Sequence, residues 1–294
     1  KESPTDDWEK SQLRTLLGGI SWHAQQVAPH LSADVSLLLS QINSSTTETI
    51  KQANGLLDQA RAMKEHRMKI HKIPVDQLML CAWCDAASQN RHDGYSTQGI
   101  VIGAVPKDLL RGQCVPVSFM SWHSSKITRV CRSPGASEAA AAVNAEDLLF
   151  FARFQLAEML GFPVQVRSIN KAVNTIQGCV VTDSRNVFDK LSTEVLCPKG
   201  AERRTDLELL SLKESQLRNH VCIRWVHSEA QLANSLTKTK EMRQLMLFYQ
   251  MHQTWRIVED SSMASAKKRK QRGQPPLENG PGHQNLETAH TSHT

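Results

Sequence analysis

Three acidic residues stand at places in the sequence where a strand is expected to end or a helix to begin. Asp85 and Asp183 each follow a short apolar run, and Glu138 lies in the first turns of an Ala-rich segment. Carboxylates that converge in one place repel one another unless a cation is present. Oxygen ligands without His or Cys suit Mg²⁺ or Mn²⁺. Two such ions can activate a water and stabilise a leaving oxygen in phosphodiester hydrolysis.

The elements around these acids predict how they could meet. The runs 78–84 and 178–183 are apolar in the manner of central strands. If the two strands are parallel neighbours, both aspartates emerge at the sheet edge where α/β folds place their ligands. A helix that crosses this edge would bring Glu138 there. Taken singly, such an aspartate more often serves as a turn residue or cap, and Glu138 could simply complement a helix dipole.

The rest of the pattern between residues 74 and 252 predicts one α/β domain with a mixed sheet. Ser133-Pro134 is typical of an N-cap followed by proline at the first helical position. Further strands are expected at 99–105, 115–122 and 221–226, and helices at 134–160, 187–191, 205–217 and 229–251. The resulting order, β-β-β-α-β-α-α-β-α, is typical of α/β folds.

The two flanks differ from this central part. Residues 1–73 predict a small helical segment, in which Ser45 and Glu48 form a capping-box pattern. Residues 253–294 predict a disordered basic tail, because few apolar residues offset the ordering entropy. The run Lys267–Arg272 fits a solvated tail, with a nuclear-import patch or a nucleic-acid arm as alternatives. Since the first residue is Lys1, we expect a piece of a longer chain.

Composition narrows the classes of protein. With 40% hydrophobic and 22% charged residues, the chain reads as globular, and its net charge of +6 fits contact with a polyanion. It has no apolar run of about 18 residues, so we expect no membrane span. Seven cysteines at irregular spacings indicate a reducing compartment, and hence an intracellular protein, cytoplasmic or nuclear. Cys81 and Cys84 should face opposite sides of one strand, as buried structural residues rather than a zinc or redox pair.

Several short runs follow one another in the order and spacing of one known family. They are Cys84-Asp85-Ala86, Gly94–Gly99, Trp122–Arg129 leading to Glu138, Thr182–Asn186, Arg204-Thr205-Asp206 and Gln231–Lys238. Together they resemble the ribonuclease H (RNase H) domain of the Pol polyprotein of copia-type LTR retrotransposons. Residues 13–39 are similar to the segment that links the polymerase of that family to its RNase H.

This resemblance implies an RNase H-like fold, a mixed five-stranded sheet with flanking helices, preceded by the small helical segment. It implies a nuclease, an Mg²⁺- or Mn²⁺-dependent hydrolase that cuts the RNA strand of RNA–DNA hybrids. In that role Asp85 would bridge both metals, and Glu138 and Asp183 would each bind one. The implied partners are the hybrid, recognised by its shape and 2′-hydroxyls, and the upstream reverse transcriptase region of the same polyprotein.

The sequence also departs from the family at the site. Asn234 stands where the family has an aspartate, the fourth ligand, and Ala136 and Ala139 replace the earlier acid and the tyrosine around Glu138. An asparagine carbonyl would weaken the second metal site, unless Asp206 compensates. These departures favour an alternative, a catalytically degenerate domain that binds nucleic acid without cleaving it.

Other residues are weaker candidates. A histidine near His227 helps product release or positions water in RNase H enzymes, although a surface loop residue is as good an interpretation. Lys126 and Arg129 could contact phosphates or be solvated charges, and Trp122 and Trp225 are expected in the core.

Two further classes of protein share part of this pattern of acids. An integrase of the same superfold has its acids in the order Asp, Asp, Glu, whereas this chain has Asp, Glu, Asp. A plain α/β protein whose acids are caps would bind no divalent metal.

Overall fold

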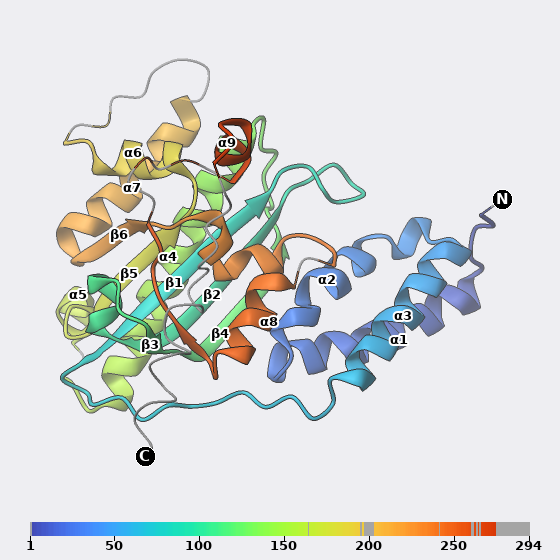
Figure 1. The fold of residues 1–294 in the computed structure, drawn as a ribbon, viewed down its shortest axis with the longest axis horizontal. Helices are drawn as coiled ribbons and strands as arrows, with labels where there is room; N and C mark the ends of the chain where they lie inside the picture. Colours follow the sequence, from blue (N-terminus) through green and yellow to red (C-terminus); the bar gives the residue numbers. More distant parts are fainter. Residues whose placement is uncertain are drawn as a thin grey trace.

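A computed structural model describes residues 2–163, 165–194, 196, 203–240, 242–259, 262, 264 and 266–274. Its centre is a mixed five-stranded sheet flanked by helices, and α1, α2 and α3 form a separate group beside that sheet (Figure 1). The expected α/β class with a mixed five-stranded sheet is therefore confirmed. None of the helices in the described part of the chain combines the length and apolar character that crossing a bilayer requires.

Five strands make the central sheet, in the order β4-β2-β1-β5-β6. They are β1 (Leu78–Ala87), β2 (Thr97–Pro106), β4 (Ser118–Lys126), β5 (Gln177–Thr182) and β6 (Val221–Trp225). β2 pairs antiparallel with β1 and β4, whereas β5 pairs parallel with β1 and β6. Strand β1, which contains Asp85 near its end, and strand β5, which ends directly before Asp183, are thus parallel neighbours, the arrangement that would bring the two aspartates to one edge.

The helices follow the predicted pattern over most of the chain. The α-helices are α1 (Asp7–Gln26), α2 (Ser32–Ser40), α3 (Thr47–Ala62), α4 (Pro134–Met159), α5 (Ile169–Val173), α6 (Arg185–Ser192), α7 (Arg203–Arg218), α8 (Arg243–Gln250) and α9 (Ala266–Gln271). The short 3₁₀ turns are η1 (Pro29–Leu31), η2 (Ile42–Ser44), η3 (Lys107–Arg111), η4 (Val166–Ser168), η6 (Ser228–Ala230) and η7 (Leu232–Leu236).

Strand β1 is buried on both of its faces because two different cores cover it. Cys81 and Trp83 belong to the core that includes η7 and α8, and Ala82 and Cys84 belong to the core against α4. The prediction that Cys81 and Cys84 face opposite sides as buried residues is therefore confirmed, and both are free thiols.

The expected helix over 229–251 is wrong. Two 3₁₀ turns, η6 and η7, precede α8, which begins only at Arg243. Side chains cap these turns locally: the backbone N–H of Glu229 donates to Nδ1 of His227, and that of Ala233 donates to the Gln231 side chain. Such side-chain contacts to nearby backbone compete with a continuous helix.

Helix α3 begins one residue later than its sequence pattern predicts. The capping box is formed by Thr46 and Thr49, not by Ser45 and Glu48. The Ser45 hydroxyl instead donates to the carbonyl of Ile42. The one-residue shift moves the helix start but leaves its apolar face on the core of the helical segment.

The folded part extends past the expected boundary at residue 252. Strand β7 (Thr254–Trp255) pairs antiparallel with β3 (Val115–Pro116), and Trp255 and Ile257 are buried in the core that covers β1. Helix α9 lies within the stretch expected to be disordered. Residues 275–294 of the expected tail lie outside the described residues.

The helical segment docks onto the α/β part through aromatic contacts. Trp122 on β4 donates from Nε1 to the carbonyl of Ala24 on α1 at 2.8 Å. His30 on η1 lies with Nδ1 3.2 Å from the hydroxyl of Tyr249 on α8, and its ring meets His66 edge-on. A histidine thus lies buried between the two parts of the chain.

This buried histidine predicts a pH-dependent stability. Burial, followed by the charges of His66 and His23, lowers the pKa of His30 to about 4. The folded protein therefore favours neutral His30, and stability is lost as pH falls from about 6.5 towards 4. The loss attributable to His30 at pH 5 is about 2 kcal/mol. Thermal unfolding at pH 7.5 and pH 5 should show a smaller pH effect in His30→Gln, whereas His92→Gln, an exposed control, should behave as wild type. Equal pH effects in all three proteins would contradict this account.

Candidate active site

The three predicted acids meet at one edge of the sheet. Asp85 lies near the end of β1, Asp183 directly follows β5, and Glu138 lies in the first turns of α4. Each offers a carboxylate oxygen, and these oxygens lie within 4.8 Å of one another. Asp85 is only 3% exposed. The structure thus brings together side chains that are separated by up to a hundred residues along the chain.

The parallel register places the two aspartates side by side. Cys84 is opposite Thr182, so the next residue on each strand is one of the acids. The side-chain amide of Gln231 links the ends of β1 and β5. It donates to the carbonyl of Cys84 at 2.9 Å and to that of Val181 at 3.3 Å. Trp225 donates from Nε1 to the backbone carbonyl of Asp183 at 3.0 Å.

The start of α4 is fixed by its cap. The Ser133 hydroxyl accepts from the backbone N–H of Ala136. The hydroxyls of Ser137 and Ser96 lie 3.0 Å apart, which links α4 to the residue before β2. The backbone N–H of Ala86 donates to Glu138.

Two positions around Glu138 where the sequence departs from the resembled family have a structural role. Ala136 and Ala139 are both buried. Ala136 packs with Ile127 and Cys131, and Ala139 belongs to the core between α4 and the sheet. Both alanines therefore contribute to the hydrophobic packing around α4.

The electrostatics of the three carboxylates call for a cation. Burial, then the negative charge of Asp85, raises the pKa of Asp183 to about 8, and burial with Asp85 and Asp183 raises the pKa of Glu138 well above its usual range. Among the described residues, Oε2 of Glu138 is buried without a hydrogen-bond partner. Because all three donors are oxygens whose negative charges repel one another, the set fits a divalent cation such as Mg²⁺ or Mn²⁺.

Two further residues at this site were not predicted. The Thr237 hydroxyl donates to Oδ2 of Asp85, and Asn90 donates from its amide to the backbone carbonyl of Thr237 at 2.7 Å. The positive charge of Lys238 lowers the pKa of both Glu138 and Asp183, against the effect of burial. Thr237 and Lys238 belong to the run Gln231–Lys238. That run carries part of the family resemblance, but the sequence assigned no role to these two side chains.

Asn234 and Asp206 are both engaged in other contacts. The Asn234 amide donates to the carbonyl of Ser228 at 2.6 Å, and its backbone carbonyl lies 3.0 Å from the Thr237 hydroxyl. Asp206 is buried on α7 and pairs with Lys190 at 2.7 Å, away from the carboxylate cluster. The role of Asn234 as a weakened fourth ligand stays a prediction.

His227 is fully buried rather than exposed in a loop, so the surface interpretation is wrong. It caps η6, and a role in product release stays a prediction that requires this segment to open. Trp122 and Trp225 are buried, as predicted. Arg129 pairs with Glu208 and donates to the carbonyl of Ala136.

Removing the Thr237 hydroxyl tests how Asp85 is held. In Thr237→Val the carboxylate of Asp85 loses the hydrogen bond from Thr237 while the side-chain shape is kept. Loss of such a supporting hydrogen bond to a metal ligand typically costs about 10–100-fold in metal affinity or activity. Metal titration of Thr237→Val should show this loss, with Thr239→Val as the matched control. A variant that binds metal as wild type does would show that Asp85 is positioned without Thr237.

No family model matches the sequence, and no curated protein matches it. The chain is similar to three solved structures, among others. RNase H1 isolated from compost by a metagenomic approach is 12% identical, with 54% of this chain and 92% of that chain covered and a TM-score of 0.34. RNase H1 from the archaeon Halobacterium salinarum is 17% identical, with coverages of 54% and 94% and a TM-score of 0.32. The foamy viral protease–reverse transcriptase, in complex with an RNA/DNA hybrid, is 10% identical, with coverages of 60% and 21% and a TM-score of 0.34.

Proposed function

We propose that the chain is a ribonuclease H of the retrotransposon type that hydrolyses the RNA strand of RNA–DNA hybrids with a divalent metal. The observation that carries the proposal is the cluster of Asp85, which is buried, with the partly buried Glu138 and Asp183, whose carboxylate oxygens lie within 4.8 Å of one another. Three carboxylates this close, largely withdrawn from water, cost stability through mutual repulsion, so their assembly is difficult to explain as structural support.

Each residue of the cluster has a role in this proposal. Asp85, Glu138 and Asp183 would hold Mg²⁺ or Mn²⁺. Such ions, when bound, lower the pKa of a water and stabilise the charge on a leaving oxygen. Thr237 orients Asp85 through its hydrogen bond. Lys238 places a positive charge beside the carboxylates and so reduces the repulsion that a phosphate meets there.

The substrate class follows from the sequence resemblance and from the site's chemistry. Hydrolysis at an acidic cluster of this kind carries no base-specific contact, so the choice of strand depends on backbone shape and on the 2′-hydroxyl of RNA. In a longer chain, the upstream reverse transcriptase region would supply the hybrid.

A specific observation favours the second candidate, a domain that binds hybrid without cutting it. At the fourth ligand position of the resembled family stands Asn234, a neutral side chain whose amide nitrogen is held by the carbonyl of Ser228. If a fourth ligand is needed for turnover, this chain binds hybrid and leaves it intact.

The test is cleavage of an RNA–DNA hybrid in which each strand carries its own label. With Mg²⁺ or Mn²⁺, we expect only the RNA strand to be cut, and EDTA to stop the reaction. Cutting of both strands would exclude this function. Hybrid binding without cutting, followed by cutting in Asn234→Asp, would establish the second candidate.

A further inference from the structure

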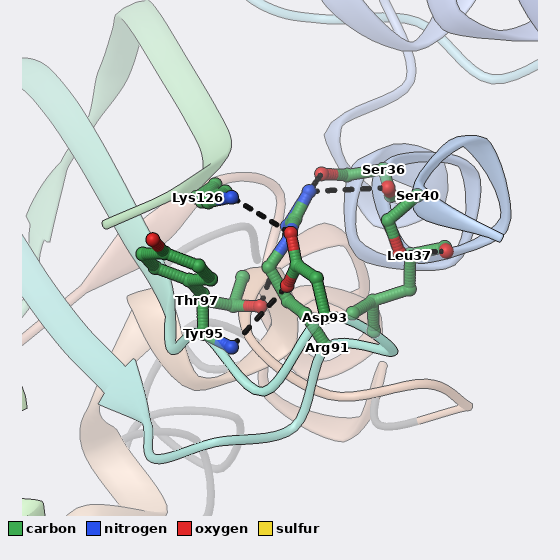
Figure 2. A network of polar contacts seen from close by, with 8 residues as sticks. All are labelled: Ser36, Leu37, Ser40, Arg91, Asp93, Tyr95, Thr97 and Lys126. Atoms are coloured by element: carbon green, nitrogen blue, oxygen red, sulfur yellow. Dashed lines mark hydrogen bonds and ion pairs between the residues drawn. The ribbon is translucent and has the colours of Figure 1, made fainter. Parts of the chain in front are cut away.

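A polar cleft separates the helical segment from the edge strand of the sheet. It has a volume of about 510 Å³ and lies between α1 and α2 on one side and β4 with the β1–β2 loop on the other. Its lining includes Ser32, Ser36, Arg91, Asp93, Ser124 and Lys126. Figure 2 shows Arg91 reaching α2 from the loop and Lys126 meeting Asp93 beside it.

The cleft is lined by hydrogen-bond donors. The Arg91 guanidinium donates to the Ser36 hydroxyl at 3.1 Å, to the Ser36 carbonyl at 3.3 Å and to the Thr97 hydroxyl at 3.4 Å. Three other polar atoms of the lining are buried and have no hydrogen-bond partner among the described residues: Nε of Arg91 and the hydroxyls of Ser32 and Ser124. Ser32 is itself only 6% exposed. These three donors without a partner, beside the positive charges of Arg91 and Lys126, suit an anionic ligand.

The net charge of the cleft also favours an anionic ligand. Arg91 and Lys126 carry two positive charges, and Asp93 supplies one negative charge, so these three residues sum to +1. Asp93 pairs with Lys126 at 2.7 Å, and the ammonium of Lys126 lies over the ring of Tyr95. Arginine, lysine and hydroxyl groups are the usual donors to nucleic-acid phosphates.

The position of the cleft relates it to the carboxylates. In the sheet register Asp85 is opposite Gly99, and Gly99 is opposite Ser124. Residues paired in this way point to the same face, and two strand spacings amount to roughly 10 Å. The inner wall of the cleft is therefore on the same face of the sheet as Asp85, two strands away from it.

We propose that this cleft binds a backbone phosphate of the nucleic acid that lies on the carboxylates, at a position other than the scissile one. The proposal rests on the proposed function for the choice of nucleic acid as the source of the phosphate. It gives the helical segment a part in substrate binding, because Ser32 and Ser36 on α2 form one wall. Asp93 competes with the phosphate for Lys126.

Asp93→Asn is the sharpest test, because it predicts tighter binding, which misfolding cannot mimic. Asparagine keeps an acceptor for the backbone N–H of Tyr95 and releases Lys126. Fluorescence anisotropy with a labelled RNA–DNA hybrid should show an affinity several-fold higher and a salt dependence steeper by up to about one unit of log K against log salt. All proteins carry Asp85→Asn, so that turnover does not consume the probe.

Two variants should weaken binding. Lys126→Gln is expected to reduce affinity about tenfold and the salt slope by about one. Ser32→Ala should reduce affinity without loss of thermal stability, because its hydroxyl has no hydrogen bond to lose. Lys171→Gln on α5, which makes the same charge change before the start of β5, is the matched control and should bind as the parent does.

The outcomes separate this proposal from the proposed function. Unchanged affinity and slope in Asp93→Asn and Lys126→Gln would overturn the cleft as a phosphate site, even if the wild type cuts RNA. An equal loss in Lys171→Gln would overturn it too, since the effect would then be one of net charge. The expected pattern in a chain that does not cut hybrid would support the cleft while the nuclease proposal fails.

Discussion

Replacing Asp85 by asparagine is expected to abolish metal-dependent cleavage and, in EDTA, to stabilise the fold. Loss of a residue that only supports a metal ligand already costs up to about 100-fold, so loss of a central carboxylate should cost more. Stability should rise because the charge of Asp85 raises the pKa of both Asp183 and Glu138, which means that it opposes their ionisation. The measurements are the initial rate of RNA cleavage and the melting temperature with and without metal.

The matched control is Asp58→Asn, the same chemical change on the exposed surface of α3. It should leave both the rate and the melting temperature as in wild type. If Asp85→Asn cuts RNA at the wild-type rate, the carboxylate cluster is not the site of cleavage. A lower melting temperature in EDTA would show that Asp85 supports the fold through a contact stronger than the repulsion.

Gly99→Ala is expected to damage both stability and activity, because η7 lies directly on this residue. A Cβ atom at Gly99 would lie 2.7 Å from the carbonyl oxygen of Ala233, 2.7 Å from Cβ of Leu236 and 2.9 Å from Cγ2 of Thr237. Since one of these atoms is backbone, η7 must move away. Overpacking of this kind costs about 1–3 kcal/mol, and the movement withdraws Thr237 from Asp85, which should lower the cleavage rate. Chemical denaturation and the cleavage assay measure the two effects.

Gly55→Ala is the control for this prediction. Gly55 lies inside α3 with nothing within 4 Å of a built Cβ, so alanine should stabilise the helix by about 0.5–1 kcal/mol. If Gly99→Ala is as stable and active as wild type, η7 does not hold Thr237 in the way described.

Secondary structure is predicted best from the sequence where an element is long or has a simple pattern. The apolar run 78–84 and the Ser133-Pro134 cap predicted β1 and α4 because burial on both faces and helix capping are local signals. The meeting of Asp85, Glu138 and Asp183 also followed from sequence, since ends of parallel neighbouring strands share one edge.

The features that sequence reasoning missed depend on contacts made at a distance. The run 229–251 has helical spacing, yet His227 and Gln231 cap short turns, and the latter also binds carbonyls at the ends of β1 and β5. Thr237 reaches Asp85, and Lys238 lies near the carboxylates, only because η7 packs against Gly99 in the folded chain. The cleft beside β4 likewise requires the helical segment to dock, which Trp122 and Ala24 secure from opposite parts of the chain.

We infer that the carboxylates of Asp85, Glu138 and Asp183 are brought together to hold a divalent cation, and calorimetric titration with Mg²⁺ and Mn²⁺ distinguishes this role from a structural one. We expect saturable binding to the wild type, loss of that binding in Asp85→Asn, and a melting temperature that rises with metal only in the wild type. Absence of binding to the wild type, or equal binding to both proteins, would contradict this assignment and leave the three acids as structural residues.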